Sequence, residues 1–238
     1  VANLGNNLAY EDKAYVPTWF TFRQLIQQRL NWNSWGSLGI DIALGAVIDR
    51  TATPWEHQFL PDYTFESLQT ATLTKKGETA ALLKKTTTLN EAGTRNKNSN
   101  LFLSPFFVFL VIGLGIVCIT VKDRKLQKRT RWLDGVIFLV TGIVGILLLV
   151  LWFGTDHTAT ANNYNILWAF PLNLFFCSLI WSRAPKKWLR RYVFFLIIIL
   201  ALLTLHWSTG VQEFAPTLLP LLIALFVRYV YLARYLKE

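Results

Sequence analysis

The side chains best suited to chemistry lie in a short polar loop between two apolar runs. Asp156 and His157 are adjacent there, and Asn163 and Asn165 follow in the same loop. An acid beside a histidine can shift the pKa of the imidazole or fix its tautomer, and amide side chains can bind phosphate or glycerol oxygens of a lipid. Short loops also need polar residues simply to form turns, so a purely structural role is the competing interpretation.

Two carboxylates in the polar N-terminal region form a second candidate. Asp41 and Asp49 are eight residues apart, which places them about 80° apart around a single helix, on one accessible side. Such a pair can act as general acid and base. Paired carboxylates on a surface helix are nevertheless commonplace, and His57 beside Glu56 has no motif-bearing serine or cysteine near it in the sequence.

No residue of the chain stands in a recognisable nucleophile motif. Cys118 and Cys177 both fall inside apolar runs, without the spacing of metal ligands. Small buried hydrophobic side chains are the favoured interpretation for both. The sequence also lacks G-x-S-x-G, H-E-x-x-H, phosphate-loop and zinc motifs. We therefore expect no metal, no cofactor and no catalytic residue within this chain.

Five apolar runs must position the polar loops. A bilayer core of about 30 Å requires about 20 apolar residues in a helix, because backbone polar groups must be satisfied within the segment. The runs that fit are residues 101–121, 135–153, 166–181, 188–207 and 214–232, the third being interrupted by Pro171 and Asn173. The predicted fold is mainly α: a small extracytoplasmic α+β segment followed by a five-helix transmembrane bundle.

The net charge of +10 is concentrated in the membrane half. Residues 1–100 hold ten Lys+Arg and nine Asp+Glu, whereas residues 101–238 hold fourteen and five. The fourteen basic residues of the membrane half fall as six, none, five and none in the four successive connections, with three at the C-terminal end from Arg228. In a five-helix topology they all lie on one side of the membrane. Because cytoplasmic loops retain Lys and Arg, we predict an inner-membrane protein with residues 1–100 periplasmic and the C-terminus cytoplasmic. No basic stripe interleaved with aromatics indicates nucleic-acid binding.

The polar region has the pattern of mixed structure. Apolar spacing predicts amphipathic helices over residues 22–30 and 38–48, with Pro54 stopping the second. Asp62 could cap a third helix that runs through Ala71, and alternation around Gly77 predicts a hairpin. We divide the chain into an outer segment (1–85), a linker (86–100) and a membrane domain (101–238). The chain has no methionine and begins at Val1, so we expect the outer segment to be the tail of a larger domain.

Two stretches of sequence carry a family resemblance. GIDIALGAVIDR at 39–50 is followed by FLPDY at 59–63, and WFGTDH at 152–157 is followed by NYNILWAFP at 163–171. They resemble the C-terminal half of a Bacteroidota inner-membrane family. The exported N-terminal domain of that family is similar to papain-like and lecithin:retinol-acyltransferase-like thiol enzymes, and one branch is assigned as a lipoprotein N-acyltransferase. The resemblance covers nearly the whole chain.

The resemblance implies that the catalytic cysteine and histidine lie upstream of Val1. It carries over only a set of supporting or lipid-binding candidates, namely Asp41, Asp49, Asp156, His157, Asn163 and Asn165. It implies the membrane part of an acyltransferase that N-acylates lipoproteins with a phospholipid acyl donor. The implied partners are membrane phospholipid, lipoprotein substrates, and the missing N-terminal domain or other membrane subunits. The alternatives are a papain-like cell-envelope hydrolase with a membrane anchor and a non-enzymatic subunit of a larger membrane complex.

Overall fold

The structure, a computed structural model, describes residues 8–9, 16–75, 77–89 and 100–236. The chain forms two compact units. The first contains residues 1–29 and 50–98, and the second contains residues 30–49 and 99–238. The described part is mainly helical, with five apolar membrane-type helices preceded by a small sheet, so the predicted fold class is confirmed. Most of the proposed linker, residues 90–99, lies outside the described residues.

The first unit combines three short helices with a small sheet. The helices are α2 (Phe22–Gln27), α4 (Pro54–His57) and α5 (Pro61–Thr70). The strands β1 (Leu8–Ala9), β2 (Thr72–Lys75) and β3 (Glu78–Ala81) pair antiparallel in that order. Gly77 has a φ of 87°, a left-handed conformation that glycine adopts without a Cβ clash. The predicted hairpin is therefore confirmed.

Prolines begin helices in this unit rather than ending them. Pro54 opens α4, where the Thr53 hydroxyl accepts from the Glu56 amide at 3.3 Å and the Glu56 carboxylate accepts from the Thr53 amide at 2.9 Å. Pro61 likewise opens α5, so Asp62 lies in the first turn and is not the cap that the sequence suggested. The prediction failed because proline's fixed φ favours the first helical position.

A compact apolar cluster of Leu25, Ala52 and Leu60 is buried in the first unit. His57 is fully buried beside it. Its Nδ1 lies 2.8 Å from the Thr53 carbonyl oxygen, and its Nε2 accepts from the Phe20 amide at 3.4 Å. Both ring nitrogens are thus engaged with backbone, which makes His57 a packing residue.

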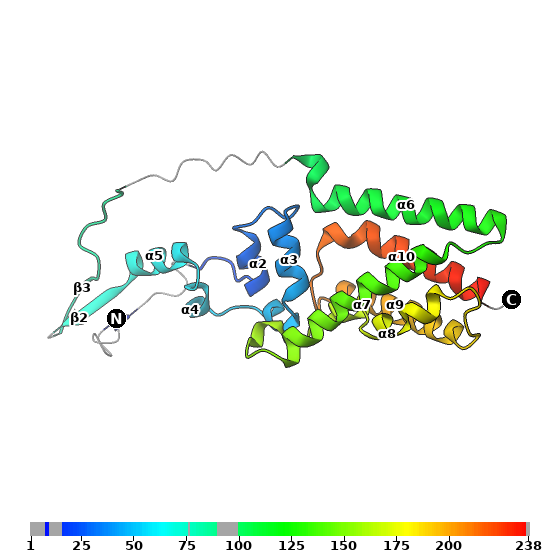
Figure 1. Cartoon of the computed structure of the whole chain (residues 1–238). Coiled ribbons are helices and arrows are strands. Elements are labelled where there is room, and N and C mark those ends of the chain that lie inside the picture. Colours follow the sequence, from blue (N-terminus) through cyan, green and yellow to red (C-terminus); the bar gives the residue numbers. More distant parts are fainter. Residues whose placement is uncertain (1–7, 10–15, 76, 90–99, 237–238) are drawn as a thin grey trace. The chain divides into compact units, whose positions relative to one another are not determined.

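The second unit contains the five membrane-type segments (Figure 1). Four are continuous through most of their length: α6 (Pro105–Leu126), α7 (Arg131–Phe153), α9 (Leu189–Ser208) and α10 (Leu219–Tyr235). The short turn η3 (Leu101–Leu103) precedes α6, and η6 (Pro216–Leu218) leads directly into α10. The number of spans predicted from hydropathy is confirmed, each being long and apolar enough to cross a bilayer.

The third span is broken into short pieces. Its one regular helix is too short to cross a bilayer alone. Its helix α8 (Leu172–Trp181) is about 15 Å long at 1.5 Å per residue. It follows two single turns, η4 (Thr158–Thr160) and η5 (Tyr164–Leu167). The interruption predicted at Pro171 is confirmed, because α8 begins only after this proline, whereas Asn173 lies inside α8 and does not break it. Irregular backbone at membrane depth has to be buried in protein, and Trp168 and Ala169 are indeed buried.

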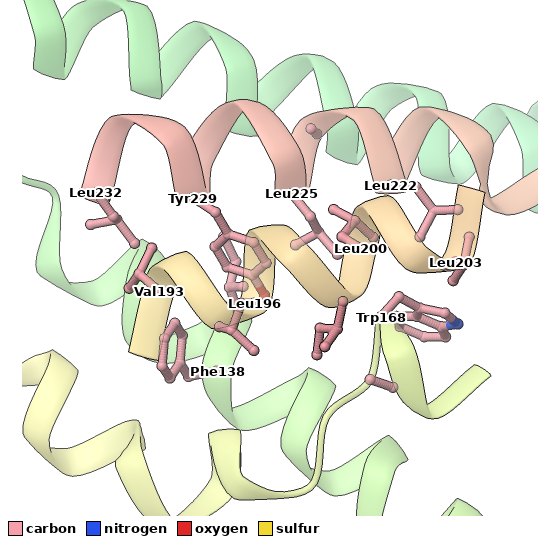
Figure 2. Close-up of a cluster of buried hydrophobic side chains, with 14 of the residues drawn as sticks. Phe138, Trp168, Val193, Leu196, Leu200, Leu203, Leu222, Leu225, Tyr229 and Leu232 are labelled. Carbon is pink, nitrogen blue, oxygen red and sulfur yellow. The ribbon is translucent and has the colours of Figure 1, made fainter. Parts of the chain in front are cut away.

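Leucine-rich faces of α9 and α10 form the middle of the membrane unit (Figure 2). Leu196, Leu200 and Leu203 from α9 meet Leu222 and Leu225 from α10, all of them buried.

The broken third span approaches α7 at two glycines. A Cβ on Gly142 would lie 2.2 Å from the Leu174 amide nitrogen, and one on Gly145 would lie 2.2 Å from the Ala169 carbonyl oxygen. Only glycine permits this backbone approach, which is a common way for membrane helices to pack.

Residues 30–49 belong with the membrane helices, a division that the sequence did not indicate. This docking segment contains α3 (Trp35–Ala43) and the turn η2 (Ala46–Asp49). Trp35 Nε1 donates to the Leu103 carbonyl oxygen at 2.9 Å, and Asn33 Oδ1 accepts from the Phe106 amide at 3.0 Å. Leu38 is buried in the membrane-unit core. The docking segment is therefore anchored to the start of α6.

Candidate functional site

Two buried asparagines hold the docking segment to the broken third span. Asn163 Nδ2 donates to the carbonyl oxygens of Ile42 at 2.7 Å and Ala43 at 3.0 Å. Asn165 Nδ2 donates to the Asp41 carbonyl oxygen at 2.9 Å, while its Oδ1 accepts from Trp168 Nε1 at 3.0 Å. These carbonyl oxygens are in the last turn of α3, where carbonyl oxygens have no hydrogen-bond donor within the helix. The two amides therefore cap α3 from a distant part of the chain.

The backbone completes this junction immediately after α3. The Gly45 amide donates to the Ala159 carbonyl oxygen at 2.9 Å, and the Ala46 amide donates to the Asn162 carbonyl oxygen at 3.0 Å. A Cβ on Gly45 would lie 1.9 Å from the Ala161 carbonyl oxygen. The junction therefore requires glycine at position 45. We call this end of the membrane unit, comprising residues 154–171, the connection 209–218 and the docking segment, the amide end.

The junction explains why the predicted helix over residues 38–48 is confirmed only as far as Ala43. Helix α3 ends at Ala43, and Asp49 lies in the separate turn η2. Asp41 is buried at 3% exposure, whereas Asp49 is only partly buried. The two carboxylates therefore do not share one accessible helix side, and the geometry offers no general acid/base pair at these positions.

Asp156 and His157 lie in the same loop, but their side chains are exposed. Within the described part of the chain, neither side chain forms a hydrogen bond or ion pair, so the structure does not join them to Asn163 and Asn165. The His157 carbonyl oxygen accepts from the Thr160 hydroxyl at 2.8 Å, which shapes the turn. Both side chains are thus free to meet a ligand from outside.

The connection between α9 and α10 adds a buried amide. Gln212 is fully buried, and its Oε1 accepts from the Tyr164 amide at 2.8 Å. Among the described residues, Gln212 Nε2 and Thr217 Oγ1 are buried without a hydrogen-bond partner. The Tyr164 ring packs 4.5 Å from the His206 ring. The amide end thus contains two buried polar groups without a hydrogen-bond partner among the described residues.

An apolar groove of about 670 Å³ runs between α9 and α10 toward the amide end. Its walls include Leu203 and Trp207 from α9 and Leu219 and Ile223 from α10. Thr204 and Ser208 are its polar members, and no charged side chain lines it. A groove of this size and polarity suits an acyl chain better than a charged ligand.

Buried charges connect the helices at their opposite end. The fully buried Arg228 donates through Nε to Asp134 Oδ1 at 2.7 Å and through Nη1 to Asp123 Oδ2 at 2.8 Å. Asp123 also accepts from the Thr130 amide at 2.8 Å. Arg129 donates to the Ile180 carbonyl oxygen at 2.8 Å. The cluster joins α6, α7 and α10, and the arginine at position 228, inside an apolar run, was the sequence signal that could have revealed it.

The described residues contain no thiol or metal centre at the amide end. Cys118 lies in α6 and Cys177 in α8, where its Sγ donates to the Gly135 carbonyl oxygen at 3.3 Å. No group of three or more His, Cys, Asp or Glu side chains in the described ranges could hold a metal ion.

A comparison with protein families identifies the membrane part. Residues 96–238 match a family model for the Lnb transmembrane domain, which covers more than half of the chain. The chain belongs to the Lnb transmembrane domain family. No curated protein and no solved structure matches it. The Lnb match includes the loop at residues 154–165, which we call the amide loop, together with the groove and the buried charge cluster. It supports the resemblance to a Bacteroidota membrane family.

Proposed function

We propose that this chain is the membrane part of a lipid-using acyltransferase that N-acylates lipoproteins. The observation that carries the proposal is the uncharged groove between α9 and α10 at the amide end of an Lnb transmembrane domain. The groove would hold one acyl chain of a phospholipid donor. The reactive thiol belongs to a domain upstream of Val1.

The proposed chemistry transfers one acyl group in two steps. A cysteine thiolate attacks the ester carbonyl of the phospholipid, forming a thioester and releasing the lysophospholipid alkoxide, which takes up a proton. The amino group of the lipoprotein's N-terminal cysteine then attacks the thioester, forming an amide. The thiolate leaves, and the amine loses its proton. A covalent intermediate of this kind divides one difficult transfer into two easier ones.

Three features at or beside the amide end support a donor-binding role. The groove is apolar and uncharged, as an acyl chain would require, and the buried Gln212 Nε2 and Thr217 Oγ1 are unpaired donors among the described residues. Ester and phosphate oxygens of a lipid are acceptors for such groups. The exposed Asp156 and His157 face outward from the same end and would contact the head group or the incoming thiol domain.

The orientation follows from charge and is part of the proposal. The connections at residues 127–130 and 182–188 are rich in Lys and Arg, whereas the amide loop and the connection 209–215 have none. By the positive-inside rule, the amide end is periplasmic and the C-terminus is cytoplasmic. A cysteine introduced at Lys125 should resist an impermeant thiol reagent added to spheroplasts, and one introduced at Asp156 should react. Reversed labelling would refute this orientation.

Blocking the groove tests the acyl-chain role in the intact gene. Ala201 lines the groove and is exposed, so Ala201→Phe should fill it without removing any buried side chain. We expect lipoprotein N-acylation, measured by mass spectrometry of lipoprotein N-termini, to fall at least about tenfold, equivalent to about 1.4 kcal/mol. Val140→Phe, on an exposed position of α7, is the matched control. Full acylation in Ala201→Phe cells at normal protein abundance would reject the groove.

The amide loop needs its own variants. His157→Ala and Asp156→Asn alter exposed side chains, so stability should change by no more than about 0.5 kcal/mol. If the pair positions the lipid or the acyl-enzyme, N-acylation falls while membrane abundance is unchanged. Thr158→Ala in the same exposed turn is the control. Normal acylation in both variants would return this pair to a turn-forming role. If the variants lose hydrolase activity but keep N-acylation, the envelope-hydrolase alternative is favoured.

A further inference from the structure

A second groove lies at the opposite end of the membrane helices, between α6 and α10. It has a volume of about 460 Å³. Val121 of α6 and Phe226 and Val230 of α10 form its apolar wall, while Arg124 and Arg234 line it nearer the helix ends. The groove therefore combines a hydrocarbon surface with two cationic groups, unlike the uncharged groove between α9 and α10.

The two arginines are available to an outside ligand. Both side chains are exposed, and neither forms an ion pair or side-chain hydrogen bond within the described residues. The described carboxylates at this end, Asp123 and Asp134, are both engaged by the buried Arg228. The positive charge of Arg124 and Arg234 therefore has no compensating carboxylate among the described side chains.

The groove is held in shape by its neighbours. Thr120, at its inner side, accepts from Arg228 Nη1 at 3.4 Å, so the groove adjoins the buried charge cluster. The Tyr231 hydroxyl donates to the Lys128 carbonyl oxygen, which places this aromatic ring between the apolar wall and the polar helix ends. Tyrosine is typical of membrane–water interfaces for this reason.

We propose that the groove between α6 and α10 is a binding site for an anionic phospholipid. One acyl chain lies along Val121, Phe226 and Val230, and the phosphate and head group meet Arg124 and Arg234. Basic pockets between transmembrane helices bind anionic lipid head groups by this combination of forces. The site is separate from the proposed donor groove, and it does not depend on the chain's role in acyl transfer.

Native mass spectrometry of the full chain in detergent tests the site. The probes are dioleoyl phosphatidylglycerol and dioleoyl phosphatidylcholine, which have the same acyl chains and differ in head-group charge. Each basic side chain near an anionic head group strengthens binding about fivefold, so two predict a preference of roughly 25-fold for phosphatidylglycerol. The preference should shrink at 0.5 M salt, because screening weakens exposed charge pairs.

Three variants separate this site from general electrostatic attraction. Arg124→Gln/Arg234→Gln should lose most of the preference, whereas Arg183→Gln/Lys186→Gln removes the same charge from an exposed loop and should retain it. Val230→Phe keeps both arginines but occupies the apolar wall, and should weaken phosphatidylglycerol binding. Thermal unfolding midpoints confirm that the variants are folded. Equal binding of both lipids to the wild type, equal loss in the loop control, or full binding in Val230→Phe would overturn the proposal.

Discussion

Asn165→Ala tests whether the amide junction holds the docking segment on the membrane unit. Asn165 is fully buried, and the change removes its donor to the Asp41 carbonyl oxygen and its acceptor for Trp168 Nε1. Leaving two buried polar groups unpaired, at about 1 kcal/mol each, predicts a cost of about 2 kcal/mol. Local opening of residues 38–49 should then become roughly 30-fold more frequent.

Hydrogen exchange by mass spectrometry reads this opening directly, because the Gly45 and Ala46 amides are bonded across the junction. Peptides covering residues 38–49 should exchange faster in Asn165→Ala. Asn165→Asp should be worse despite its similar shape, since it turns an oxygen toward carbonyl oxygens. Thr158→Ala, an exposed change in the same loop, should have no effect. Unchanged exchange of residues 38–49 in both Asn165 variants would refute the capping argument.

Further outcomes follow from the same geometry. Arg228→Met should cost about 3–5 kcal/mol in detergent-denaturant unfolding, because two buried carboxylates lose their partner; a cost below 1 kcal/mol would contradict the buried cluster. Gly142→Ala should greatly reduce stability through its 2.2 Å backbone clash, whereas Gly115→Ala has open space and should be neutral or stabilising by up to about 1 kcal/mol. The hydrogen bond from Arg50 lowers the pKa of Glu56 to about 2. The ion pair therefore contributes its full stability above pH 4.5, the ordinary pKa of the carboxyl, and loses it as the pH falls toward 2. Carboxyl NMR should show a midpoint near 2 for Glu56, and a midpoint near 4.5 would exclude the pairing.

The number of membrane spans follows from composition alone. A run of about 20 apolar residues has no stable place in water and satisfies its own backbone as a helix. The helices α6 and α7 therefore need no tertiary information, and the hairpin at Gly77 follows from local turn chemistry. The broken third span was signalled by Pro171, although the position of its first helical residue was not.

The roles of the polar candidates needed the fold. Asn163 and Asn165 have the same side-chain chemistry whether they bind a lipid or cap a helix, and only the approach of α3 makes them caps. Asp41 and Asp49 were separated by the end of α3 at Ala43. That end is imposed by residues more than a hundred positions later in the chain, which no local pattern contains.

The sequence by itself determined the five-span architecture, because hydrophobic length and backbone satisfaction are local properties of each run. Only the tertiary structure decided that residues 30–49 join the membrane unit, that Arg228 is enclosed by two carboxylates, and that the two grooves differ in charge. Each of these depends on which helix faces meet. Facing surfaces are selected by shape and by pairing of buried polar groups between segments far apart in the chain, and single-segment periodicity does not contain that information.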